Sequence, residues 1–196
     1  MRRSDVEREN RARLDRQRQF RGAADVVTDA WMAFPVVRAI AVIGSVARPL
    51  WKEVPRFHEY RSRGIELWHE CGDLDLAVWL DSLNGLDALR RTRARALREM
   101  FEAGASFGIV GHQVDTFLFE PGSQRYLGRL CSFNQCPKGK RDCLVSGCGA
   151  IPFNKVIDGF VPRDDLLVGA VMLYERGIGR LRLAADLPKP LDDGPA

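Results

Sequence analysis

The stretch that decides the fold covers residues 36–48 and consists of Val36-Val37-Arg38-Ala39-Ile40-Ala41-Val42-Ile43-Gly44-Ser45-Val46-Ala47-Arg48. Its first eight residues form a β-branched, almost continuous apolar run, which predicts a strand buried on both faces. Gly44 and Ser45 end that strand in a tight turn before a predicted helix start. Such a turn is a place where phosphates bind, because glycine lets backbone amides approach the phosphate closely. The stretch therefore predicts both a core strand and an anion site.

Carboxylates accompany two further predicted strands. Leu74–Leu80 is apolar, but Asp73 precedes it and Asp75 interrupts it. Because strand side chains repeat every two residues, both acids point to one face, about 6.5 to 7 Å apart. Such a pair favours a bound cation, and hard oxygen ligands select Mg²⁺, although a strand end that merely meets water has the same pattern. Asp115 lies inside a third predicted strand, 112–119, where an unpaired charge is costly. If these two strands are neighbours, three acids converge on a site that can hold two Mg²⁺ ions.

These segments resemble the signature of a known family. Gly44-Ser45-Val46-Ala47-Arg48 followed by Asp73-Leu74-Asp75-Leu76-Ala77-Val78 is similar to the motif of the DNA polymerase beta-like nucleotidyltransferase superfamily, in particular its minimal nucleotidyltransferase branch. The resemblance implies that Gly44 and Ser45 contact the nucleotide phosphates, with Arg48 in the same nucleotide-binding loop. It also implies that Asp73 and Asp75 bind both metal ions, and that Asp115 is the third ligand and the base-like partner of the acceptor hydroxyl.

The resemblance also implies a fold and an activity. The expected fold is α+β, a small mixed β-sheet flanked by helices over residues 23–125, with a small zinc-binding-like extension in residues 126–183. The expected activity is transfer of a nucleoside monophosphate from an NTP, with ATP as the default donor, to an acceptor hydroxyl, with release of pyrophosphate. The acceptor, whether a small molecule, a protein or an RNA, is not specified by these residues. The alternative is an inactive shell that binds nucleic acid or protein through its Cys-rich and basic segments.

The sequence departs from the family pattern between the two motifs. Ser45 and Asp73 lie 28 positions apart, so residues 49–70 form an insertion beside the predicted site. A surface loop tolerates such an insertion because closure entropy grows slowly with length. Pro49 replaces the family's glycine and Gly72 its serine. The aromatic and basic residues of the insertion either cover the core or grip a base or an acceptor; they are Trp51, Lys52, Arg56, His58, Tyr60, Arg61, Arg63, Trp68 and His69.

Four cysteines lie close together in the chain, at Cys131, Cys136, Cys143 and Cys148. In a reducing compartment this density favours a tetrahedral, structural Zn²⁺ site over disulfides. Independent thiols, a redox pair and an iron–sulfur cluster are the alternatives. The fifth cysteine, Cys71, is expected to be a small apolar packing residue.

The net charge of +4 comes entirely from the start of the chain. Residues 1–21 contain eight arginines and four acids, and the remaining body is formally neutral, so no globally basic binding surface is implied. Residues 1–22 are predicted to form a charged, exposed helix or arm.

Without a secretory signal or an apolar run of about 18 residues, a cytoplasmic location and no membrane partner are expected. Further expectations are helices over 23–34, 86–103 and 163–176, and a disordered tail over 184–196.

Overall fold

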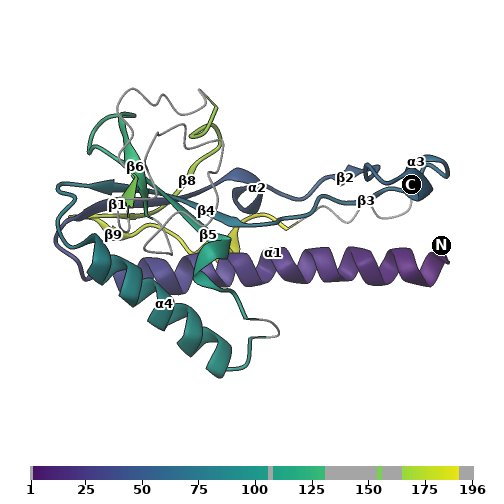
Figure 1. The fold of residues 1–196 in the computed structure, drawn as a ribbon, viewed down its shortest axis with the longest axis horizontal. Coiled ribbons are helices and arrows are strands. Elements are labelled where there is room, and N and C mark those ends of the chain that lie inside the picture. The colour runs from purple at the N-terminus through teal and green to yellow at the C-terminus, as the bar shows by residue number, and fades with distance from the viewer. Residues whose placement is uncertain (1, 106–107, 131–153, 156–164, 190–196) are drawn as a thin grey trace.

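A computed structural model of the chain describes residues 2–105, 108–130, 154–155 and 165–189. Its centre is a seven-stranded sheet in the order β7-β6-β5-β4-β1-β8-β9 (Figure 1). Strands β4 and β5 pair in parallel, and the other neighbours in the sheet are antiparallel. The strands are β1 (Val37–Ile43), β4 (Leu74–Leu80), β5 (Val114–Phe119), β6 (Tyr126–Leu130), β7 (Asn154–Lys155), β8 (Val171–Glu175) and β9 (Gly179–Arg180). The α+β class, with a mixed sheet flanked by helices, is confirmed.

Two long helices pack on one face of this sheet. They are α1 (Arg3–Met32) and α4 (Leu86–Glu102), and they contact each other below the sheet in the view of Figure 1. Alternate strand residues supply the core, which includes Ile40, Leu76 and Leu118. Trp31 of α1 is fully buried, and its Nε1 donates a hydrogen bond to the carbonyl of Leu89 at 3.0 Å. The helices are therefore anchored both by apolar burial and by this direct bond.

The opposite face of the sheet carries a second, smaller apolar cluster. Its buried members are Ala41, Ile43, Ala77 and Phe119. Because side chains alternate along a strand, Asp75 and Asp115 belong to this face rather than to the helix-covered one. The carboxylates thus lie on the face away from α1 and α4.

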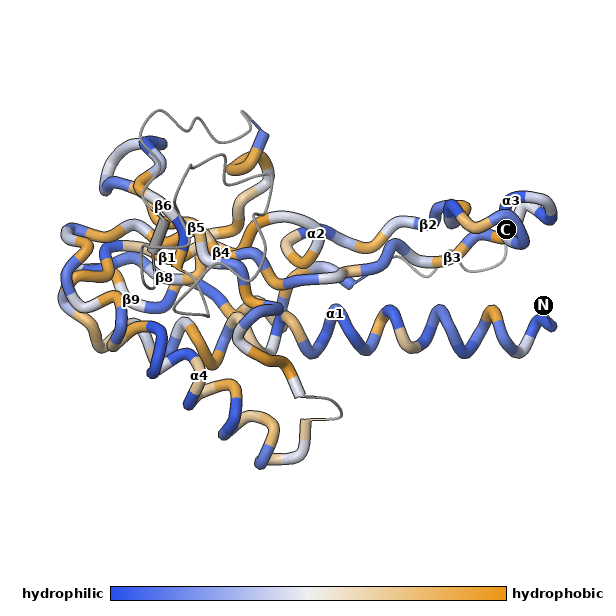
Figure 2. Tube along the Cα trace, in the orientation of Figure 1, coloured by the Kyte–Doolittle hydropathy of each residue, from blue (hydrophilic) through white to orange (hydrophobic). Residues whose placement is uncertain are grey.

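The start of the chain is a helix, as predicted, but it is continuous with the following one. Helix α1 spans both expected segments, and its N-terminal half extends beyond the sheet beside the 49–70 insertion (Figure 1). Hydrophilic residues dominate that half in Figure 2. Five of its arginines form ion pairs with acids, at Arg3, Arg8, Arg13, Arg16 and Arg18. Five of the eight arginines of residues 1–21 are thus paired within the described structure, four of them with acids of the same segment that the net charge already includes.

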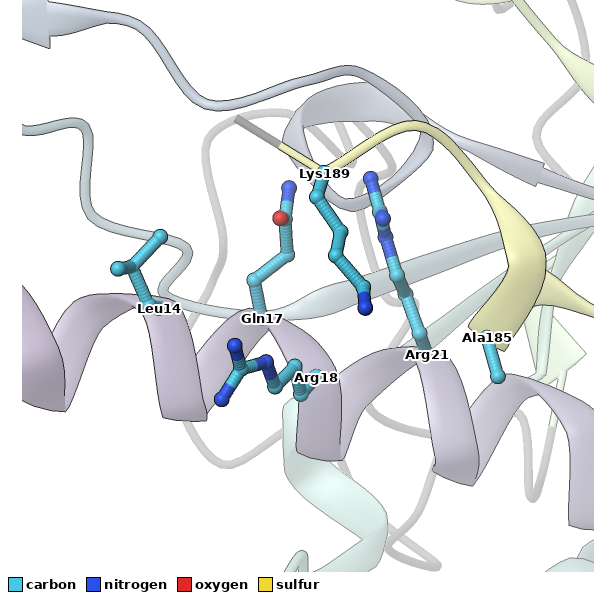
Figure 3. A pocket seen from close by; sticks show the side chains of 6 residues that line it. All are labelled: Leu14, Gln17, Arg18, Arg21, Ala185 and Lys189. Carbon is cyan, nitrogen blue, oxygen red and sulfur yellow. The ribbon is translucent and has the colours of Figure 1, made fainter. Parts of the chain in front are cut away.

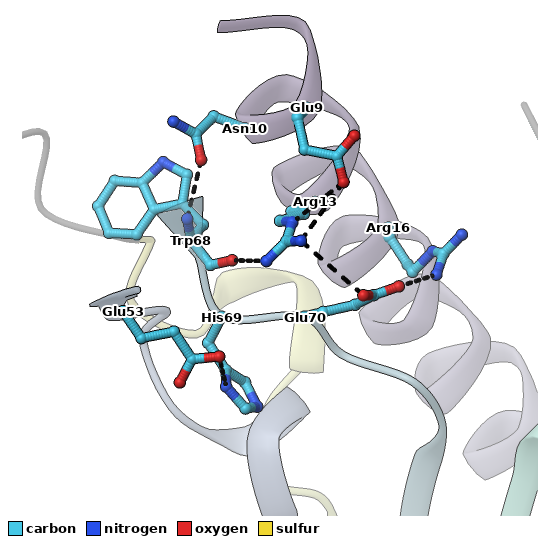
Figure 4. A network of polar contacts seen from close by, with 8 residues as sticks. All are labelled: Glu9, Asn10, Arg13, Arg16, Glu53, Trp68, His69 and Glu70. Atoms are coloured by element: carbon cyan, nitrogen blue, oxygen red, sulfur yellow. Dashed lines mark hydrogen bonds and ion pairs between the residues drawn. The ribbon is translucent and has the colours of Figure 1, made fainter. Parts of the chain in front are cut away.

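The insertion contains the two-stranded sheet of β2 (Lys52–Glu53) and β3 (Leu67–Trp68), joined through the short α3 (His58–Arg61). Helix α1 holds this hairpin through polar contacts (Figure 4). Arg13 Nη1 donates to the carbonyl of Trp68 at 2.6 Å, and the Trp68 amide donates to Oδ1 of Asn10 at 2.8 Å. Arg16 adds an ion pair with Glu70 at 2.7 Å. The insertion is therefore fixed to the helix and packs Leu67 and Trp68 against it.

The C-terminal part of the described structure corrects two predictions. The helix expected over 163–176 is wrong: Val171–Glu175 is strand β8, paired with β1. Gly169, with φ +76°, ends the preceding turn, and pairing with the open edge of β1 overrides the helical spacing of apolar residues. The tail expected to be disordered from residue 184 instead begins with the 3₁₀-helix η4 (Ala184–Asp186). Ala184 and Leu187 are buried there.

Arg21 ties this C-terminal segment to the rest of the fold. Its guanidinium donates to four carbonyls, those of Val46, Arg48, Leu187 and Pro188, at 2.8 to 3.1 Å. Figure 3 shows it extending from α1 toward that segment. Burial lowers the pKa of Arg21, although an arginine stays charged at neutral pH.

Of the described helices, none is long and apolar enough to span a bilayer.

Candidate functional site

Asp75 and Asp115 lie side by side on the two parallel strands of the sheet. They are register partners, with Asp75 in β4 and Asp115 in β5. Neighbouring strands are about 4.8 Å apart, so the two carboxylates emerge next to each other on the same face. Both residues are only partly exposed. The predicted juxtaposition of these two acids is therefore present in the structure.

Asp115 forms an ion pair with a residue that the sequence did not point to. Arg129 lies in β6, opposite Phe117 of β5, and its guanidinium contacts the Asp115 carboxylate. The Arg129 side chain is 6% exposed and lies 5.0 Å from the centre of the Phe117 ring. A positive charge beside Asp115 offsets the repulsion between neighbouring carboxylates. The signal available in the sequence was a lone arginine within the otherwise apolar segment Tyr126–Leu130.

Gly44 brings the turn after β1 into contact with Asp75. Its φ of +69° is open to glycine but strained for other residues, and the adjacent Ile43 is the register partner of Asp75. A Cβ atom at position 44 would lie 2.7 Å from Oδ2 of Asp75. The Asp75 carboxylate can therefore occupy this position because Gly44 has no side chain.

A side chain of α1 hydrogen-bonds the rest of the turn. Helix α2 (Gly44–Ala47) follows β1 directly. Gln17 Nε2 donates to the carbonyls of Ser45 and Arg48, at 3.3 and 2.8 Å. The Ser45 hydroxyl hydrogen-bonds the thiol of Cys71, a fully buried free cysteine that packs in the core as predicted. Burial raises the pKa of that thiol, and the Ser45 bond opposes the rise. These contacts hold the loop in place for its predicted role.

A pocket of about 510 Å³ opens beside this turn. This volume falls within the range of small-molecule sites. Among the residues that line it are the predicted Gly44, Ser45, Arg48 and Asp75, together with Ile43, Trp51, His69, Asp165, Leu166 and Val168. Arg48 Nη2 donates to the carbonyl of Val168 at 2.9 Å, which joins the loop to the segment before β8. Asp165 was missed because its segment was interpreted as the first turn of a helix.

Asp73 stands apart from the other two acids. It is exposed, precedes β4 and does not line the pocket. Within the described ranges, no three side chains of the His, Cys, Asp and Glu types are grouped closely enough to hold a metal ion. The structure therefore pairs Asp75 with Asp115 and does not gather the predicted three. Cys131, Cys136, Cys143 and Cys148 lie outside the described residues.

Comparisons with known proteins found no relative of this chain. No protein-family model, curated protein or solved structure matches the chain.

Proposed function

We propose that the protein is a metal-dependent nucleotidyltransferase that moves a nucleoside monophosphate from an NTP, with ATP as the default donor, to an acceptor hydroxyl. The observation that carries the proposal is the placement of Asp75 beside Asp115, with the Gly44 turn against the Asp75 carboxylate. The Gly44 turn and the Asp75 carboxylate then line one pocket, with Asp115 on the neighbouring strand, and phosphoryl transfer needs phosphate-binding and acidic groups close together. The motif resemblance supplies the reaction class.

The side chains present suit a hard divalent cation. Asp75 and Asp115 offer carboxylate oxygens from adjacent strands, which are the donors that Mg²⁺ prefers. Asp115 is already ion-paired with Arg129, so a cation at this carboxylate would have to share it with that guanidinium. We propose that Asp75 and Asp115 would hold Mg²⁺. Asp73, which the motif resemblance gives as a further ligand, is not gathered with them in the described structure. When bound, Mg²⁺ lowers the pKa of the acceptor hydroxyl and neutralises the triphosphate charge.

Each residue of the proposed site would have its own role in the transfer. The turn at Gly44 and Ser45 lets backbone amides approach the phosphates, and Arg48 adds positive charge at the pocket edge. Asp115 accepts the proton of the acceptor hydroxyl. The acceptor oxygen bonds to the α-phosphorus as the bond between that phosphorus and the α–β bridging oxygen breaks. Pyrophosphate then leaves with the bridging oxygen.

The test is transfer from each of four labelled NTPs into a cell extract, followed by identification of the labelled product. Asp75→Asn keeps the size of the side chain and removes its charge, so it is expected to abolish transfer without unfolding the protein. Asp81→Asn, just past the opposite end of β4, is the matched control and should retain transfer. Circular dichroism confirms that each variant is folded. Full transfer by a folded Asp75→Asn chain contradicts the assignment.

A second candidate is supported by the Asp115–Arg129 ion pair. A carboxylate neutralised by a buried arginine does not need a metal ion, and this suits a shell that binds without turnover. Such a module would engage nucleic acid or protein through its Cys-rich and basic segments, and binding would weaken with salt. Absence of any labelled product, together with salt-sensitive binding unchanged by EDTA, would favour it over the enzyme.

A further inference from the structure

Two aromatic rings are stacked at the rim of the pocket. The centroids of the Trp51 and His69 rings lie 3.9 Å apart, with 21° between the ring planes. The two residues flank the paired strands β2 and β3, and the His69 amide donates to the Trp51 carbonyl at 2.7 Å. Both line the same pocket as Gly44 and Asp75. The insertion thus contributes a planar surface to the site.

Glu53 holds both rings through one carboxylate. Trp51 Nε1 donates to Glu53 Oε2 at 3.2 Å, and His69 Nδ1 lies 3.1 Å from Glu53 Oε1 (Figure 4 shows the His69 contact). Two hydrogen bonds to a shared carboxylate restrict the rotation of each ring. A ring fixed before a ligand arrives loses less conformational entropy on binding. The aromatic surface is therefore preorganised.

Trp51 does not cover the core, in contrast to the other tryptophan of the insertion. Trp68 is 7% exposed and belongs to the main core, whereas Trp51 is 41% exposed. One face of the Trp51 indole stacks on His69, and much of the side chain still meets solvent. A large aromatic side chain that is oriented by hydrogen bonds yet left accessible in a pocket suits a planar ligand.

We propose that Trp51, supported by His69 and Glu53, stacks the nucleobase of the bound nucleotide. This inference rests on the proposed function, because it assigns the base of the same NTP whose phosphates meet the Gly44 turn. Trp51 follows Arg48 by three residues, so the phosphate-binding loop and the platform belong to one continuous segment. Every nucleobase has a π face, so the platform accepts any of the four NTPs.

The experiment measures binding of ATP and of inorganic tripolyphosphate, which lacks the base, to the full chain in Mg²⁺ by calorimetry. Trp51→Ala is expected to weaken ATP binding about 5- to 150-fold, the usual effect of removing a base-stacking ring, and to leave tripolyphosphate binding unchanged. Trp51→Phe should retain most of the ATP affinity. Phe57→Ala is the matched control, because Phe57 is an aromatic residue of the same insertion, 74% exposed and outside the pocket. It should bind both ligands as the unmodified chain does.

The outcomes separate the platform from the proposed reaction. Equal ATP affinity in Trp51→Ala and the unmodified chain, or equal weakening of ATP and tripolyphosphate, overturns the platform. An unmodified chain that binds neither ligand overturns it as well. If ATP binding depends on Trp51 but no labelled transfer product forms, the platform stands and the nucleotidyltransferase proposal fails. If transfer occurs and Trp51→Ala binds ATP as tightly as the unmodified chain does, the nucleotidyltransferase proposal stands and the platform fails.

Discussion

Gly44 and the Asp75 carboxylate fit together with no room to spare: a Cβ atom at position 44 would lie 2.7 Å from Oδ2 of Asp75. The two residues come from different strand ends, since Gly44 follows β1 and Asp75 lies within β4. Any side chain at position 44 must therefore displace an acid of the proposed site. The turn and the carboxylate form one structural unit.

Gly44→Ala should reduce both stability and transfer. A residue other than glycine at positive φ costs about 1–3 kcal/mol, and displacing the Asp75 carboxylate by an ångström is expected to lower transfer about 100-fold. Gly122→Ala is the matched control, because Gly122 has φ +68° and no atom within 4 Å of an added Cβ. Its free energy of unfolding, measured with denaturant, should fall, but its transfer rate should stay the same. Equal transfer rates in the two variants would be inconsistent with the contact.

Asp115→Ala should destabilise the protein by about 3 kcal/mol or more, because it removes the carboxylate partner of a buried guanidinium. Asp73→Ala removes an exposed carboxylate and should change the free energy of unfolding by less than about 0.5 kcal/mol without metal. Urea unfolding in EDTA measures both. A comparable loss in the two variants would mean that the ion pair with Arg129 contributes little.

Arg21→Ala is expected to cost about 3 kcal/mol, since four carbonyls lose their shared donor and a buried space is left. Arg18→Ala, three residues earlier on α1, removes an exposed partner of Asp15 and should cost less than about 1 kcal/mol. Hydrogen exchange adds a local readout: amides of residues 184–187 should lose protection in Arg21→Ala alone. Unchanged protection there would exclude Arg21 as the anchor of this segment.

Cys71 should resist alkylation while the protein is folded. Burial raises the pKa of its thiol, so the native state keeps a proton that the unfolded chain loses at lower pH. The associated stability is fully present below the unfolded thiol pKa of about 8.5 and is lost as pH rises through the native pKa. Stability should therefore fall less steeply above that pH in Cys71→Ala. Site-resolved mass spectrometry should find slow modification of Cys71 by iodoacetamide at pH 8, accelerated by denaturant; equal rates in both states would exclude the shielded thiol.

The four other cysteines give a prediction from sequence alone. If Cys131, Cys136, Cys143 and Cys148 bind Zn²⁺, native mass spectrometry should show a mass lower by one zinc atom after chelation. The variant Cys136→Ser should bind less zinc than the unmodified chain. An unchanged native mass with and without chelator contradicts a zinc site.

The strands next to the site were predictable, because their signals are local. The apolar run at residues 36–43, the Asp73–Asp75 spacing and the β-forming residues around Asp115 each specify a strand, and the parallel register then aligns Asp75 with Asp115. Helix α4 was equally clear from its apolar periodicity and its glycine end.

The errors and omissions arose where distant pairing decides the structure. Residues 171–175 satisfy helical spacing, yet the vacant edge of β1 recruits them as a strand. Arg129 meets Asp115 only because β6 returns antiparallel to β5, which no local pattern reveals. Trp51 and Trp68 have the same side chain within one insertion, and only the hairpin register and the contacts with α1 place one in the pocket and the other in the core.

The position of β1 between β4 and β8 has a consequence for biosynthesis. One edge of β1 can pair with β4 soon after both have been translated, but β8 is made much later in the chain. At ordinary elongation rates of ~5–20 residues per second, the second edge of β1 stays unpaired for about ten seconds. During that interval the nascent chain exposes a strongly apolar, β-branched edge of the kind that templates aggregation. Chaperone dependence of the newly made chain should therefore decline sharply once residue 175 has been released from the ribosome.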